Sequence, residues 1–299
     1  MSLLVLGTVA LDSVKTPSGK RDCLLGGSAS HFSMSARLFT DVHLVATIGE
    51  DFPLHDRDFL RSMKLNLDSL KVNTGETFKW EGEYQGSLNS AITLKTELGV
   101  LATFDPLVTE KQRGIRCVFL ANTDPEIQMR LLKQMHKPGL VALDSMNFWI
   151  NSKRKELLKV LKMVDIYVVN DEEARSLSGE HNLIKAGRKL RSMGPEMVLI
   201  KKGEHGAMLY SDKFIFPMPA YPVETVVDPT GAGDTFAGGF MGYLAQSGKA
   251  TEAVLKEAIA YGTVAASFNV EAFGLERTSK LTIRDLRNRL SKFRKMMKF

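Results

Sequence analysis

The chain has 299 residues, of which 44% are hydrophobic and 25% are charged, a composition that suits one large α/β domain with a sizeable core. No apolar run approaches the length of a membrane span, and the first residues lack the basic start and cleavage site of a secretory signal, so a membrane or secreted protein is not expected. The net charge of +6 is concentrated near the C-terminus, and Cys23 and Cys117 are expected as free thiols in the cytoplasm.

Apolar segments that are typical of buried strands alternate with segments that have helical periodicity along most of the chain. The predicted strands are 3–7, 42–48, 118–121, 141–144, 166–170 and 197–201. Predicted helices follow the Gly26-Gly27 turn and cover 127–135, 155–162, 182–193 and 234–245. This alternation predicts a single α/β domain over residues 1–299, with helices on both faces of a mainly parallel central sheet.

Two segments interrupt the alternation. Residues 13–25 are short, polar and rich in turns, and residues 72–104 contain alternating side chains around Phe78, Trp80 and Tyr84. Such alternation is typical of a half-exposed strand. We expect these segments to form a small antiparallel sheet that closes over a cleft as a lid, with aromatic rings that could stack on a base, cover a sugar or pack the small sheet.

The most informative stretch is residues 228–236, Asp-Pro-Thr-Gly-Ala-Gly-Asp-Thr-Phe. Gly231, Ala232 and Gly233 have almost no side-chain bulk, and the helix that follows adds unpaired N–H groups and the positive end of its dipole. We therefore expect an anion hole for a γ-phosphoryl group. Asp234 lies in the first helical turn, either as a simple cap or as a general base, and the neighbouring glycines favour the base.

This stretch resembles the C-terminal signature of the ribokinase-like (PfkB) family of carbohydrate and nucleoside kinases. Residues 7–12, 26–31, 170–173 and 201–206 match further family elements in the same order. The resemblance implies the ribokinase-like fold with a β lid, ATP and Mg²⁺ as cofactors, and transfer of the γ-phosphoryl group of ATP to a hydroxymethyl group of a sugar or sugar-like substrate. A nucleoside (adenosine-type) kinase is the alternative, and a non-catalytic ligand-binding regulator on this fold is the alternative from another class.

The resemblance also assigns roles to matched positions. It implies catalytic roles for Asp234 and for the amides of Gly231, Ala232 and Gly233. It implies acceptor binding by Asp12, Gly26, Gly27 and His31, and nucleotide binding by Asn170, Lys201, Gly203 and Gly206. Mg²⁺ would be bound by Glu173 and Asn170, and K⁺ by Asp228 and Thr230. Asp12 is expected at the end of the first parallel strand. A helix cap at Asn170 and a turn cap at Asp228 are the local alternatives. Ala10 and His31 replace residues that are often Asn, which argues against simple ribose or fructose specificity.

The expected partner is a small sugar or nucleoside. In some relatives such a lid pairs two subunits, so a homodimer through the lid is an open expectation. Residues 277–299 carry nine Lys and Arg against Asp285 alone. A solvated terminal helix explains this charge better than contact with nucleic acid or a membrane, so neither of these partners is expected.

Overall fold

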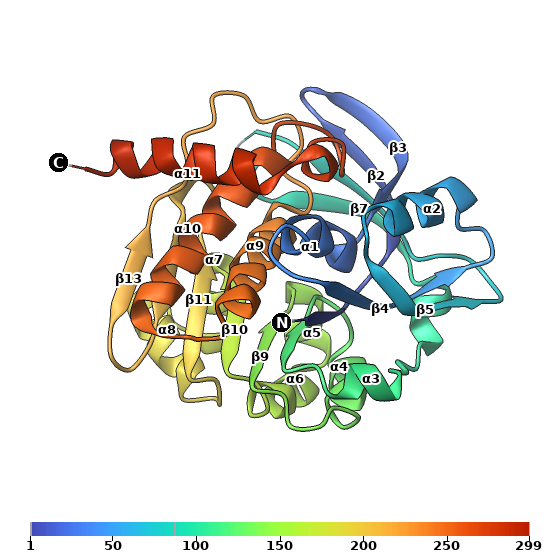
Figure 1. Ribbon diagram of the computed structural model, residues 1–299, viewed down its shortest axis with the longest axis horizontal. Coiled ribbons are helices and arrows are strands. Elements are labelled where there is room, and N and C mark those ends of the chain that lie inside the picture. The colour runs from blue at the N-terminus through green and yellow to red at the C-terminus, as the bar shows by residue number, and fades with distance from the viewer. Residues whose placement is uncertain (1, 87, 299) are drawn as a thin grey trace.

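The computed structural model describes residues 2–86 and 88–298, and among these residues the centre is a nine-stranded sheet in the order β13-β12-β11-β10-β9-β8-β1-β4-β5. Figure 1 shows it running from β13 at the left to β5 at the right. The strands are β1 (Leu3–Leu6), β4 (Val42–Gly49), β5 (Asn66–Asn73), β8 (Cys117–Leu120), β9 (Leu140–Asp144), β10 (Ile166–Asn170), β11 (Met197–Lys201), β12 (Ala207–Tyr210) and β13 (Ile215–Met218). Only the β11–β12 and β12–β13 pairs of this sheet are antiparallel, so the mainly parallel sheet is confirmed.

Helices cover both faces of this sheet because successive side chains of its strands point to opposite sides. In β1, Leu3 and Val5 enter one apolar core, and Leu4 and Leu6 enter the other. The first core is covered by α1 (Ser28–Ala36), α2 (Leu54–Ser62), α9 (Ala232–Ser247), α10 (Glu252–Asn269) and α11 (Ile283–Met296). The second is covered by α4 (Pro125–Leu132), α5 (Asn147–Ser152), α6 (Arg154–Leu161), α7 (Asp171–Ser178) and α8 (Leu183–Arg191). The shorter helical segments are η1 (Gly99–Thr103), α3 (Glu110–Arg113), η2 (Gly203–His205) and η3 (Thr278–Lys280).

The expected small sheet is present, with the strand order β3-β2-β6-β7. Its strands are β2 (Ala10–Thr16), β3 (Gly19–Gly26), β6 (Lys79–Tyr84) and β7 (Ala91–Glu97). The expected antiparallel pairing holds for β2–β3 and β6–β7 but not for β2 and β6, which pair in parallel. The predicted boundaries also shift: Val72 belongs to β5 of the main sheet, and Val100 and Phe104 are buried in the main domain.

The basic C-terminal segment forms α11, which lies along the top of the molecule in Figure 1. Leu286, Leu290 and Phe293 are buried on one face of this helix, so the helix is amphipathic and only its other face is solvated. Arg289 lies 3.3 Å from the centroid of the Phe268 ring, a cation–π contact that anchors α11 to α10. No helix in the described ranges is both long and apolar enough to cross a membrane.

Candidate active site

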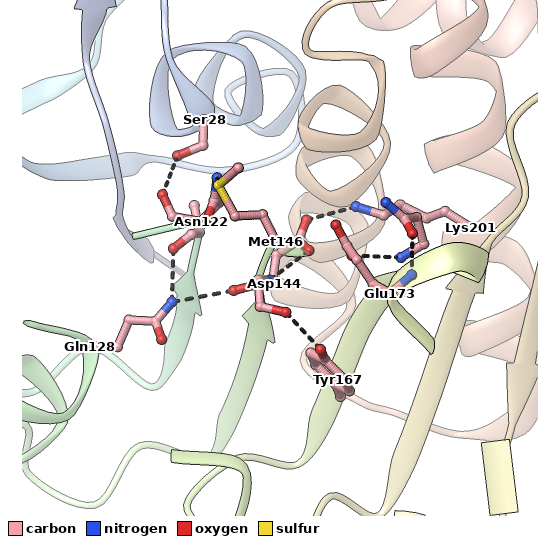
Figure 2. A network of polar contacts seen from close by, with 11 residues as sticks. Ser28, Asn122, Gln128, Asp144, Met146, Tyr167, Glu173 and Lys201 are labelled. Atoms are coloured by element: carbon pink, nitrogen blue, oxygen red, sulfur yellow. Dashed lines mark hydrogen bonds and ion pairs between the residues drawn. The ribbon is translucent and has the colours of Figure 1, made fainter. Parts of the chain in front are cut away.

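Polar side chains gather where three neighbouring parallel strands end, beside the start of α9. Asp144 ends β9, Asn170 ends β10 and Lys201 ends β11. The ammonium Nζ of Lys201 lies 2.7 Å from Oδ2 of Asp144, which is only 3% exposed (Figure 2). The carboxyl ends of parallel strands are the usual ligand-binding edge of an open α/β sheet, so this ion pair lies where a ligand is expected.

The start of α9 brings backbone donors to the same place. Gly231 is the residue before the helix, with a left-handed backbone (φ 72°). The N–H of Ala232 donates to the carbonyl oxygen of Pro229 at 3.1 Å, so this amide is engaged within the turn. For the N–H groups of Gly231 and Gly233, no backbone partner is found in the described part of the chain. These two amides are therefore the candidates for binding an anion.

Asp234 is the third residue of α9 and does not act as its N-cap, because Gly231 holds that position without a side-chain cap. Burial raises the pKa of Asp234 to about 7, with a further contribution from the negative charge of Asp144, while the Lys201 ammonium opposes the rise. The charge of Asp12 also acts on it. A carboxyl group with this pKa exchanges protons readily near neutral pH, which a general base requires.

Asn170 and Glu173 cap α7 reciprocally. The Glu173 N–H donates to Oδ1 of Asn170 at 2.8 Å, and the Asn170 N–H donates to Oε2 of Glu173 at 3.1 Å. The helix-cap alternative therefore describes Asn170 in this structure. Burial, reinforced by Asp144, raises the pKa of Glu173 to about 8. Burial alone would lower the pKa of Lys201, but the carboxylates around it raise that pKa.

Asp12 was expected at the end of the first parallel strand, and this expectation is wrong. Asp12 lies within β2 of the small sheet, because the chain leaves the main sheet after β1 and pairs next with β3. The N–H of Gly27 donates to Oδ2 of Asp12 at 3.1 Å. A Cβ atom at Gly26 would lie 2.0 Å from the same oxygen, so this glycine is needed for the close approach. Burial raises the pKa of Asp12 to about 7.

His31 and Asp228 lie beneath the glycine turn and are not open to a cleft. His31 is 2% exposed, and its Nδ1 lies 3.2 Å from Oδ1 of Asn269. Asp228 is fully buried; its Oδ1 accepts from the Thr230 N–H at 2.9 Å and its Oδ2 accepts from the Gly274 N–H at 3.0 Å. The turn-cap alternative thus describes Asp228 in this structure.

A cavity of about 580 Å³ opens beside the glycine turn. It brings together six residues matched in sequence: Asn170, Lys201, Gly203, Gly206, Ala232 and Gly233. Sequence reasoning missed the rest of its wall, which includes Leu88, Asn89, Tyr221, Pro222, Val223, Val226, Ala266 and Val270. Asn89 comes from the β6–β7 connection, and its Nδ2 donates to Oε1 of Glu204 at 3.0 Å, so the small sheet borders this cavity.

A second group that sequence reasoning missed continues from Asp144 toward α1 (Figure 2). The Gln128 amide donates to the carbonyl oxygens of Ala121 and Asp144, and the Ser28 hydroxyl donates to that of Asn122. The position of Asp144 at a predicted strand end was the one available signal. Within the described residues, no group of three or more His, Cys, Asp or Glu side chains could hold a metal ion by itself.

Comparison with known proteins matches residues 18–281 to the pfkB family carbohydrate kinase model. A cytidine kinase of Thermococcus kodakarensis is 32% identical over 250 residues, 81% of this chain and 87% of that protein. A nucleoside kinase of Methanothermobacter thermautotrophicus is 29% identical and covers 85% of this chain and 80% of its own length.

Solved structures share the fold. The nucleoside kinase of Methanocaldococcus jannaschii aligns with a TM-score of 0.76 at 21% identity, covering 97% of this chain and 98% of that chain. A putative ribokinase II from E. coli in complex with ATP and Mg²⁺ aligns with a TM-score of 0.77 at 18% identity, covering 97% and 99%. These alignments confirm the expected α/β architecture with a small second sheet.

Proposed function

The chain belongs to the pfkB family of carbohydrate kinases and is a phosphotransferase with an alcohol acceptor; we propose that this acceptor is the 5′-hydroxymethyl group of a nucleoside. The observation that carries the proposal is the similarity to the Thermococcus cytidine kinase along 81% of the chain. The family resemblance alone favours a sugar over a nucleoside, and the similarity to cytidine and nucleoside kinases reverses that order. The departure at Ala10 from the pattern common among sugar kinases agrees with this choice.

Asp234 acts as the general base in the proposed reaction. The acceptor hydroxyl gives its proton to the Asp234 carboxylate while its oxygen attacks the γ-phosphorus of ATP, and ADP leaves. The Gly231 and Gly233 N–H groups stabilise the transferred phosphoryl group. Lys201 lies close to these amides, since a Cβ atom at Gly233 would be 3.0 Å from its Nζ, and adds positive charge beside the same group.

ATP binds in the 580 Å³ cavity beside the glycine turn, whose size falls within the range typical of small-molecule sites. Tyr221, Pro222 and Val226 supply apolar wall that suits a base. Asn170 and Lys201 also line this cavity, with Lys201 beside Gly233 at the start of α9, and they suit the phosphates. The free thiols of Cys23 and Cys117 fit a cytoplasmic enzyme.

The carboxyl groups around Lys201 fit a divalent cation that arrives with the nucleotide. Asp144, Glu173 and Asp234 place three carboxyl groups against the single ammonium of Lys201. Mg²⁺ keeps most of its water and needs only one or two carboxylates beside substrate phosphates. Glu173 would hold it through water, and the ion would supply charge neutralisation for the phosphates.

A nucleoside fits the side of the site that the small sheet covers. Asp12 can accept hydrogen bonds from two ribose hydroxyls. Trp80 is the register partner of Asp12 on the neighbouring strand β6, so the two side chains share one face of the small sheet. The ring extends over Gly82, where a Cβ atom would lie 2.2 Å from it, and its Nε1 donates to Thr93. This ring is the proposed platform for the base.

The test is steady-state ADP formation with cytidine, other nucleosides, ribose and fructose under identical conditions. We expect kcat/KM for the best nucleoside to exceed that for either free sugar by about 100-fold or more, because a site built to contact a base loses those contacts with a sugar. Equal or higher kcat/KM with a free sugar would contradict the nucleoside assignment. A chain that binds these ligands without forming product would instead be the non-catalytic regulator.

Asp228 and Thr230 are retained as the proposed K⁺ site. Both Asp228 oxygens already accept an N–H group, but each keeps a second lone pair. At matched ionic strength we expect a rate about twofold or more higher in K⁺ than in Na⁺ or tetramethylammonium, since a bound ion would strengthen the field at the neighbouring amides. Equal rates in the three salts would remove the ion from the site.

A further inference from the structure

His31 packs its imidazole directly against the turn that binds the phosphoryl group. A Cβ atom at Gly231 would lie 2.2 Å from both Cγ and Nδ1 of His31. The side chain is 2% exposed, so it is not open to an acceptor, which is the role expected from the family resemblance. Its position beneath Gly231 indicates a different role.

The hydrogen bonds around His31 fix which atoms donate. Nδ2 of Asn269 donates to the carbonyl oxygen of Thr230 at 2.7 Å, so Oδ1 of Asn269 must be the accepting atom. This oxygen accepts from the Thr235 hydroxyl at 2.9 Å and faces Nδ1 of His31 at 3.2 Å. Burial lowers the pKa of His31, which favours a neutral ring, and the accepting Oδ1 of Asn269 requires the proton of that ring to be on Nδ1. Within the described residues, Nε2 is buried without a partner.

Asn269 therefore joins both sides of the anion hole. Thr230 precedes Gly231, and Thr235 follows Asp234. Asn269 reaches them from the last residue of α10. A second contact holds α1 to the same turn, because the Ser35 hydroxyl donates to the carbonyl oxygen of Thr235 at 2.7 Å.

We infer that His31 is a positioning residue of the phosphoryl-binding turn: its Nδ1–H orients the Asn269 amide, which holds Thr230 and Thr235 so that the amides of Gly231 and Gly233 and the carboxylate of Asp234 stay aligned. This inference rests on the proposed phosphoryl transfer. It assigns no contact between His31 and the acceptor. Loss of the Nδ1 donor should therefore slow transfer without weakening acceptor binding.

The test compares His31→Leu, which removes the donor, with His31→Asn, whose amide N–H can occupy the place of Nδ1–H. Misplacement of reacting groups by about 1 Å can cost about 100-fold in rate, so we expect His31→Leu to lower kcat by about 10- to 100-fold, with acceptor KM changed by less than about twofold. His31→Asn should recover kcat to within about threefold of wild type. Asn269→Asp keeps the accepting oxygen but loses the N–H group that donates to Thr230, so it should also lower kcat without raising the acceptor KM. This variant tests the role of the His31–Asn269 contact if His31→Leu does not fold.

Calorimetric binding of ADP with aluminium fluoride, a planar mimic of the transferred phosphoryl group, reports on the turn without any acceptor. We expect His31→Leu to weaken this complex by about tenfold or more while ADP alone binds as in wild type. Unchanged fluoride binding, a raised acceptor KM with unchanged kcat, or a His31→Asn variant no better than His31→Leu would each overturn the inference. Absence of turnover by the wild-type protein with every nucleoside and sugar would contradict the proposed function instead, since the fluoride result does not depend on an acceptor.

Discussion

At the scale of single residues, the candidate site is organised by the partly buried ammonium of Lys201 among carboxyl groups. Asn170, Lys201 and Asp234 could be placed in the candidate site from sequence, because strand ends and a glycine turn mark their positions. Asp144 and Asn269 could not, because their partners lie far along the chain: Asp144 is 57 residues from Lys201, and Asn269 is 39 residues from Thr230. Only the folded arrangement brings such pairs within hydrogen-bonding distance.

Glu173 gives the residue-scale prediction. Above pH 8 the Glu173 carboxyl, with its pKa of about 8, is mostly ionised. There the neutral amide of Glu173→Gln attracts a hydrated cation less strongly, so the Mg²⁺ concentration for half-maximal rate should rise by about threefold or more. The matched control is Glu172→Gln, an exposed neighbour on α7, which should titrate like wild type. Coincident Mg²⁺ titrations of Glu173→Gln and wild type would remove Glu173 from the cation site.

At the scale of elements, the sequence predicted that a small sheet exists, but it did not predict how the strands of that sheet pair. Alternating side chains marked β6, but the parallel contact between β2 and β6 joins segments more than 60 residues apart, and local periodicity does not encode such pairing. Exposed Ile92 and Leu94 on the edge strand β7 offer an apolar surface for the expected homodimer through the lid, which stays a prediction.

Closure of this sheet predicts a signal from Trp80. The chain has two tryptophans, so Trp149→Phe leaves Trp80 as the only one. Its fluorescence should change in intensity or wavelength when the acceptor binds, because the ring leaves a half-exposed environment. The Trp80→Phe variant should lose this response. Unchanged Trp80 fluorescence in a protein that still binds the acceptor would contradict lid closure.

At the scale of the whole molecule, the apolar parallel strands were predictable because burial on both faces leaves continuous apolar runs. The strands β12 and β13 were missed. Strand β13 gives no continuous apolar signal, because only one of its four residues is buried and Pro217 lies within it, whereas β12 is a buried apolar run like β1. The terminal helix was recognised from its charge, while its buried stripe of Leu286, Leu290 and Phe293 was overlooked. Its packing makes the C-terminal segment part of the kinase domain.

The central claim is that Asp234 is the general base of a kinase, and Asp234→Asn tests it most directly. Asparagine keeps the size of the side chain but cannot accept the acceptor proton, so kcat should fall by about two to four orders of magnitude. ATP affinity, measured by calorimetry, should change by less than about twofold, and the exposed control Asp58→Asn on α2 should leave both quantities as in wild type. A folded Asp234→Asn variant that turns over within about threefold of the wild-type rate would contradict the account.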